Sequence, residues 1–157
     1  MGKKGFTFLE LLITITILII LASAVMPLSQ MAVKRSKEND LRQNLRVIRT
    51  AIDEYKKASD GGRIKKDAAG SGYPPDLKIL AEGAEDLQSP QSGKKIRFLR
   101  RVPMDPMNAD SALHPDETWG LRSYQSEPDD PKEGDDVFDV YSKSGETAID
   151  GTPYRSW

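Results

Sequence analysis

The chain has 157 residues, no cysteine, and 23 basic against 24 acidic side chains, which give a formal net charge of -1. This balance carries no general signature of nucleic-acid binding or of an enzyme for acidic substrates. Disulfides are excluded, so a small exported domain needs another source of stability, such as a metal ion or assembly. Beyond a long N-terminal helix about 100 residues remain, which suits one small domain.

Residues 6–28 read FTFLELLITITILIILASAVMPL and contain one ionisable side chain, Glu10. A helix that rises about 1.5 Å per residue over this length crosses the roughly 30 Å hydrocarbon core of a bilayer. Residues 13–17 alternate as in a strand, but a lone strand in lipid would leave its backbone groups unpaired. The sequence therefore predicts a membrane-spanning helix.

Glu10 is the unusual residue of this segment, because a carboxylate near the start of a membrane helix costs about 3 kcal/mol or more and implies a cationic partner. No Lys or Arg lies between Lys4 and Lys34, so the chain supplies a cation at that depth only if cleavage creates a new amino terminus. The junction of Gly5 and Phe6 is the candidate. The plainer alternative is an uncharged or snorkelling Glu10 in an ordinary anchor helix.

Two other interpretations of the segment stay open. A secretory signal peptide is favoured by the A-x-A pattern at Ala22-Ser23-Ala24, but its apolar core would span only about 7 to 15 residues and would not contain Glu10. An uncleaved single-pass anchor is the second interpretation. Basic residues flank both ends of the segment, so the positive-inside rule does not decide its orientation.

The order Lys3-Lys4-Gly5, then Phe6-Thr7-Phe8-Leu9-Glu10, then an apolar run ending near Pro27 resembles the class III signal of type IV pilins and type II secretion pseudopilins. The resemblance implies that a prepilin peptidase removes residues 1–5 by cutting after Gly5. It also implies that Phe6 becomes the N-methylated first residue and that Glu10 acts with Phe6 in assembly. Pro27 lies where the family carries a helix-distorting proline.

A helical pattern continues beyond Pro27, which cannot donate a hydrogen bond to the Ser23 carbonyl, so a kink or a locally melted segment is expected over residues 23–27. An apolar stripe then recurs at spacings of three and four, at Leu41, Leu45, Ile48, Ile52 and Tyr55. Asp60-Gly61-Gly62 is a stop signal. The helix is predicted from about residue 6 to about residue 59, with residues 6–28 in the membrane or filament core and residues 29–60 as an amphipathic helix of a head domain.

A basic run lies on this helix at Lys34, Arg35, Lys37, Arg42, Arg46 and Arg49. We expect a solvated helix face that touches lipid phosphates or neighbouring subunits. DNA binding is the weaker alternative, since no aromatic residues alternate with these cations as a stacking platform requires. No nucleic-acid partner is expected.

Residues 61–118 form the variable part, with a loop over 61–72 and a short helix or turn over 77–81. Gly93-Lys94-Lys95 is no phosphate-binding loop, because Gln88 replaces its first glycine and Lys95 its Ser or Thr. Residues 96–106, which end in a Pro-Met-Asp-Pro turn, resemble the segment that precedes the sheet in the major pseudopilin. Met107 replaces the tryptophan that the family has after this turn.

Residues 119–126 and 136–142 are the strand candidates and could pair as a hairpin across 127–135. That connection is strongly acidic, but its prolines and spacing do not fit an EF-hand, so a solvated loop is expected. The predicted fold class is α+β and pilin-like: a long N-terminal helix packed on a small C-terminal antiparallel sheet, with the sheet and the last loop in residues 119–157.

The C-terminal pattern Asp139-Val140-Tyr141-Ser142, followed by Gly145, Asp150 and Trp157, resembles the end of the type II secretion major pseudopilin. The resemblance implies that the loop over 142–151 holds calcium through Ser142, Glu146 and Asp150. This loop is shorter than the family's, and Glu146 is the one substitute for the family's first loop aspartate.

No enzymatic activity is expected, because the single histidine, His114, lies in a Pro-rich loop with no nucleophile spaced to work with it. The resemblance implies a structural subunit of a helical pseudopilus in type II protein secretion. A subunit of a surface type IV pilus for adhesion, motility or DNA uptake is the alternative, and a monomeric membrane-anchored binding domain is third. The implied partners are further copies of the chain, minor pseudopilins, an inner-membrane assembly platform and the prepilin peptidase. The implied location is the inner membrane, single-pass with a periplasmic head, and then a periplasmic or extracellular filament.

Overall fold

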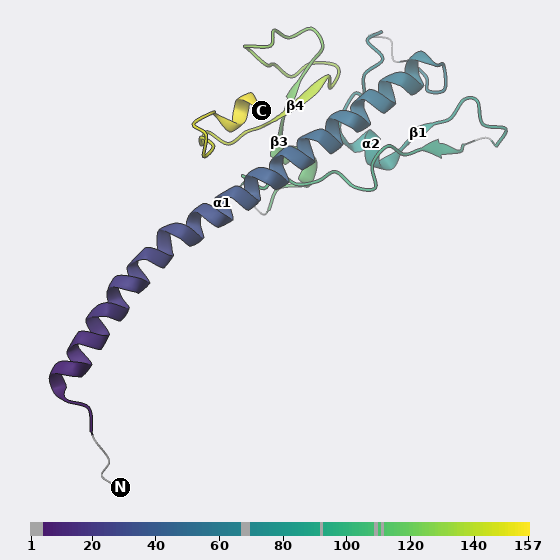
Figure 1. The fold of residues 1–157 in the computed structure, drawn as a ribbon. Coiled ribbons are helices and arrows are strands. Elements are labelled where there is room, and N and C mark those ends of the chain that lie inside the picture. The colour runs from purple at the N-terminus through teal and green to yellow at the C-terminus, as the bar shows by residue number, and fades with distance from the viewer. Residues whose placement is uncertain (1–4, 67–69, 92, 109, 111) are drawn as a thin grey trace. The chain divides into compact units, whose positions relative to one another are not determined.

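The computed structural model describes residues 5–66, 70–91, 93–108, 110 and 112–157. Figure 1 shows a long helix followed by short elements. In chain order they are α1 (Phe8–Asp60), α2 (Lys78–Glu82), β1 (Ala84–Glu85), β2 (Lys95–Ile96), the 3-10 helix η1 (Pro115–Thr118), β3 (Trp119–Arg122), β4 (Asp139–Ser142) and the 3-10 helix η2 (Tyr154–Ser156). The chain divides into two compact units, Met1–Ser36 and Lys37–Trp157.

In the first unit, the start of α1 is fixed by Thr7. Its hydroxyl oxygen accepts a hydrogen bond from the Glu10 N–H at 3.3 Å, and its carbonyl accepts one from the Leu11 N–H at 3.1 Å. One turn further on, the hydroxyls of Thr14 and Thr16 donate to main-chain carbonyls of the preceding turn at 2.9 and 2.8 Å. The hydroxyls of Thr14 and Thr16 are therefore satisfied within the helix, as a lipid environment requires.

Pro27 lies inside α1, and residues 23–27 are all helical. The local melting that we allowed for is therefore not seen in the single chain. Pro27 removes one hydrogen bond from a helix of 53 residues, and the turns on both sides keep theirs. Ser23 instead donates its hydroxyl to the Ile20 carbonyl at 2.7 Å. The distorting role of Pro27 in an assembled filament stays a prediction.

In the second unit, the predicted apolar stripe of α1 forms one side of the core. All five members are at most 7% exposed: Leu41, Leu45, Ile48, Ile52 and Tyr55. They belong to one cluster with Leu80, Trp119, Val140 and Tyr154 from the rest of the unit. The spacing of three and four thus indicated correctly which side of the helix is buried.

The end of α1 is a glycine-dependent cap, one residue beyond the predicted end. Gly62 has a positive φ of 68°, and its N–H donates to the Ser59 carbonyl at 3.0 Å. The Arg63 N–H donates to the Ala58 carbonyl at 2.9 Å. These two bonds form a Schellman motif, which explains why the Asp60-Gly61-Gly62 signal stops the helix there.

The predicted hairpin is confirmed, with shorter strands. β3 pairs antiparallel with β4 from Trp119 opposite Ser142 to Arg122 opposite Asp139. Beyond Arg122 the chain leaves the ladder, because the Ser123 hydroxyl and the Tyr124 N–H both donate to Asp136 Oδ1, at 2.7 and 2.9 Å. Side-chain bonding therefore replaces strand pairing at positions that the residue pattern had favoured for strands.

A second ladder, between β1 and β2, was not predicted. Ala84 lies opposite Ile96 and Glu85 opposite Lys95. Two residues on each strand are too few to give a period in the sequence. The α+β, pilin-like fold class is therefore confirmed by the long helix, the short antiparallel ladders and the core that they share.

Candidate functional site

The N-terminal site consists of Gly5, Phe6 and Glu10, and all three lie exposed at the beginning of the described chain. Phe6 is 78% exposed, and the large apolar side chains that the structure describes after it in α1, as far as Val33, are also exposed. Among the described residues, α1 is the one helix that is long and apolar enough to cross a membrane, with a window of mean hydropathy 2.6 that is not buried at all. Apolar surface of this extent requires lipid or other subunits to cover it.

Glu10 has no partner for its carboxylate within the described part of the chain. Its main-chain N–H donates to the Thr7 hydroxyl at 3.3 Å. Lys3 and Lys4, which precede the predicted cleavage point, lie outside the described residues. The carboxylate is therefore free to pair with a cation from outside these residues, as the sequence analysis required. Cleavage after Gly5, methylation of Phe6 and the role of Glu10 in assembly stay predictions.

The predicted calcium ligands in the last loop are used in separate interactions. Ser142 is fully buried and donates its hydroxyl to Asp105 Oδ2 at 2.6 Å. Asp150 Oδ1 accepts the N–H and the hydroxyl of Thr152 at 2.9 and 2.6 Å, and its Oδ2 lies 3.6 Å from Arg42 Nη2. These hydrogen bonds, that of the Thr152 side chain first, lower the pKa of the Asp150 carboxyl.

Glu146, the third predicted ligand, is exposed, and its recorded hydrogen bonds are made by its main chain. Nowhere in the described chain do three or more His, Cys, Asp or Glu side chains gather as a metal site would require. Calcium prefers six to eight oxygens from a converging set of ligands. The arrangement of Ser142, Glu146 and Asp150 does not fit that requirement, and calcium binding at this loop stays an untested prediction.

Asp105 is a residue whose importance the sequence analysis missed. It is 2% exposed, and besides Ser142 its carboxylate accepts the Met107 N–H at 2.8 Å. Its own N–H donates to the Thr118 hydroxyl at 3.1 Å. Asp105 therefore connects the end of β4, through its carboxylate, to the residue before β3, through its main-chain N–H.

Glu38 is a second residue that we missed. It is 8% exposed, and its Oε1 accepts the Ile149 N–H at 2.8 Å and the Tyr154 hydroxyl at 2.9 Å. The sequence did contain a signal for this buried contact, because Glu38 lies three residues before Leu41 and so falls on the same side of the helix as the apolar stripe. A charged residue at a stripe position indicates a buried polar contact.

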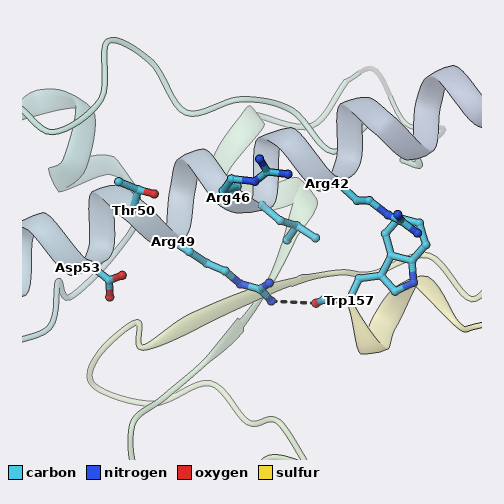
Figure 2. A pocket seen from close by; sticks show the side chains of 7 residues that line it. Arg42, Arg46, Arg49, Thr50, Asp53 and Trp157 are labelled. Carbon is cyan, nitrogen blue, oxygen red and sulfur yellow. Dashed lines mark hydrogen bonds between the residues drawn. The ribbon is translucent and has the colours of Figure 1, made fainter.

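A groove of about 580 Å³ lies between α1 and the C-terminal residues, lined by Arg42, Leu45, Arg46, Arg49, Thr50, Asp53 and Trp157. Figure 2 shows the indole of Trp157 beside Arg42, and Arg49 directed at the Trp157 main chain. The Arg42 guanidinium lies 4.2 Å from the centroid of the indole. Arg49 Nη2 donates to the Trp157 and Val140 carbonyls at 2.8 and 3.1 Å, and its Nε pairs with Asp139 at 2.7 Å.

These contacts correct part of the prediction for the basic run. Arg42 and Arg49 are not simply a solvated face, because both hold residues of the C-terminal segment. Arg46 fits the prediction: it is exposed, and among the described residues it makes no hydrogen bond or ion pair. Contact of the run with lipid or neighbouring subunits stays a prediction.

Comparison with known proteins agrees with the fold and with the N-terminal residues. The model of the prokaryotic N-terminal methylation motif matches residues 1–26. This match and the α+β fold agree with the resemblance to type IV pilin-like proteins. They also support membrane anchoring through the apolar part of α1.

The particular resemblance is to the type II secretion system core protein G, the major pseudopilin. The chain is 28% identical over 137 residues to the protein of that name from Pectobacterium carotovorum subsp. carotovorum. The aligned region covers 86% of this chain and 83% of the relative. It is also 28% identical over 137 residues to the core protein G of Klebsiella pneumoniae, which covers 86% of this chain and 92% of that relative. No solved structure matches the chain.

Proposed function

We propose that the chain is a structural, non-catalytic subunit of a helical pseudopilus that acts in type II protein secretion. The observation that carries the proposal is the exposed apolar half of α1, which overlaps the methylation motif at residues 1–26. It contains one carboxylate, Glu10, that has no partner among the described residues. Such a surface is built to move from lipid into a bundle of identical helices. The similarity to core protein G over most of the chain supports the secretion context.

In this proposal a prepilin peptidase cuts after Gly5 and methylates the new N-terminal Phe6. The subunit then sits in the inner membrane with residues 6–28 in lipid and the head in the periplasm. An assembly platform adds subunits to the base of the filament, and minor pseudopilins are further partners. Helices gain little from the hydrophobic effect while they remain in lipid, so shape and polar pairs must set their register.

Glu10 supplies that polar pair. In the assembled filament its carboxylate would neutralise the ammonium of Phe6 from a neighbouring subunit or from its own chain. An unpaired charge in hydrocarbon costs several kcal/mol, which is more than a typical single packing contact contributes. The pair therefore favours the one register that brings the two groups together.

A subunit of a surface type IV pilus for adhesion, motility or DNA uptake is the second candidate, since the methylation motif fits it equally well. The similarity to core protein G favours the secretion pseudopilus. Neighbouring genes distinguish the two: a secretin and secretion-type minor pseudopilins support the first, and a retraction ATPase supports the second.

The test is to produce the full chain with its peptidase and assembly platform, and to measure intact mass and filament yield. We expect a mature subunit that begins at N-methylated Phe6, and filaments that Glu10→Leu abolishes without loss of membrane insertion. Thr16→Val is the matched control, because the Thr16 hydroxyl bonds within its own helix. A mature chain beginning at Met1 or Val25, or normal filament yield from Glu10→Leu, contradicts the proposal.

A further inference from the structure

Three charged side chains of α1 hold the segment formed by residues 139–157. They are Glu38, Arg42 and Arg49, and we call them the α1 clamp. Their separations of four and seven residues place them along one side of the helix. Glu38 contacts residues 149 and 154, and Arg42 and Arg49 both contact Trp157 together with one other part of the segment each. Together they fix the segment along the helix at several points.

Glu38 is the buried member of the α1 clamp. Its carboxylate accepts hydrogen bonds from the Ile149 N–H at 2.8 Å and from the buried Tyr154 hydroxyl at 2.9 Å. One side chain thus fixes two groups that follow it by 111 and 116 residues. Hydrogen bonds to an ionised acceptor are stronger than those between neutral groups, and removal of the acceptor would take one such bond from each of the two donors.

Arg42 and Arg49 hold the two ends of the segment. Arg49 bonds Asp139 and the Val140 carbonyl in β4, and it also bonds the Trp157 carbonyl. Arg42 lies over the Trp157 indole and 3.6 Å from Asp150 Oδ2. Arg49 therefore ties β4 to the last residue, as the dashed line in Figure 2 marks for its Trp157 end.

Two of the three ligands that the resemblance assigns to calcium, Ser142 and Asp150, are committed to other partners. The hydroxyl of Ser142 is directed at Asp105, and Asp150 is occupied by Thr152 and by Arg42. The work of a metal ion in such a loop is to hold distant parts of the chain together. In this chain the α1 clamp already does that with side chains of the helix.

We propose that the α1 clamp fixes the C-terminal loop in place of a metal ion, so that the head folds and the subunit assembles without calcium. The statement about assembly rests on the proposed function as a filament subunit. The statement about folding does not, and it can be tested on the purified protein.

Thermal unfolding of the full chain in detergent micelles, in chelator and in millimolar calcium, tests the folding statement. A ligand that binds the folded state alone raises the melting temperature with the logarithm of its concentration. We expect the wild-type melting temperature to be the same in both conditions. Glu38→Ala should lower it by on the order of 5 °C or more in both.

Tyr154→Phe removes one of the two Glu38 bonds and should lower the melting temperature less, with an effect that is not additive with Glu38→Ala. It also keeps the test decisive if Glu38→Ala does not fold. Glu54→Ala is the matched control, because Glu54 is an exposed carboxylate of the same helix with no hydrogen bond or ion pair among the described residues. We expect no change from it.

Two results would overturn the inference about folding. One is a wild-type melting temperature that rises with calcium and loses this rise in Asp150→Ala. The other is a melting temperature of Tyr154→Phe and of Glu38→Ala equal to that of Glu54→Ala.

Filament yield from cells grown with a calcium chelator tests assembly. Filaments that persist support the inference, and filaments that form only with calcium overturn it while leaving the proposed function intact. If the wild-type chain forms no filaments in either condition, the proposed function fails, and the melting experiments still decide whether the α1 clamp replaces the metal.

Discussion

Gly120 in β3 is a position where one added methyl group should disturb the hairpin. A Cβ atom on Gly120 would lie 2.8 Å from Cδ2 of Tyr141, its cross-strand neighbour, and closer still to Cε2 and Cζ. Carbon atoms pack best at about 3.5 to 4.0 Å, so the ring must move away. Its displacement also weakens the contact with the Arg155 guanidinium, which lies 5.7 Å from the ring centroid. Overpacking of this kind costs about 1 to 3 kcal/mol.

For Gly120→Ala we therefore expect a loss of about 2 kcal/mol and a fall in melting temperature of about 5 to 10 °C. Circular dichroism of the full chain in detergent micelles measures the melting temperature. Gly145→Ala is the matched control, because no atom lies within 4 Å of its added Cβ. In a Tyr141→Ser background the penalty of Gly120→Ala should largely disappear. An equal penalty in both backgrounds, or none in the first, would refute the reasoning.

Three further predictions concern buried polar groups. Asp105→Ala should destabilise the head by about 3 kcal/mol, measured by denaturant unfolding, because it leaves the Ser142 hydroxyl and the Met107 N–H unpaired; Asp110→Ala, at an exposed position, should change little. Burial alone would raise the pKa of Asp136, but hydrogen bonds from Ser71, Tyr124 and Ser123 lower it below its ordinary value of 3.8. The stability that this carboxylate contributes is present above pH 3.8 and is lost as the pH falls through its folded-state pKa, so Asp136→Asn should flatten the acid limb of the unfolding curve. Burial, and then the hydrogen bond to Glu38, raises the pKa of Tyr154 from 10.0 to about 12, so the stability that Tyr154 contributes should be fully present below pH 10.0 and should be lost between there and pH 12. An unchanged alkaline fall in Tyr154→Phe would contradict this assignment.

The long helix could be predicted from the sequence, and the N-terminal site stays a prediction. The apolar run, the stripe from Leu41 to Tyr55 and the glycines after Asp60 each act over three or four residues, which is the range that helical periodicity and capping cover. The pairing of β3 with β4 was also predictable, because each strand carries its own run of strand-forming residues. The ends of these strands were not predictable, because Ser123 and Tyr124 hydrogen-bond to Asp136 and leave the ladder.

The sequence by itself determined where α1 lies, which of its sides is buried, and that its first half needs lipid or other helices. Only the tertiary structure decided the long-range contacts of Glu38, Asp105 and Arg49, whose most distant partners lie 116, 37 and 108 residues away along the chain. The physical reason is that burial of an apolar stripe repeats with the local period, whereas a buried hydrogen bond depends on two distant segments meeting at about 3 Å. Ser142 and Asp150 are residue types that bind metal ions. In the fold Ser142 instead donates a hydrogen bond to Asp105, and Asp150 contacts Thr152 and Arg42.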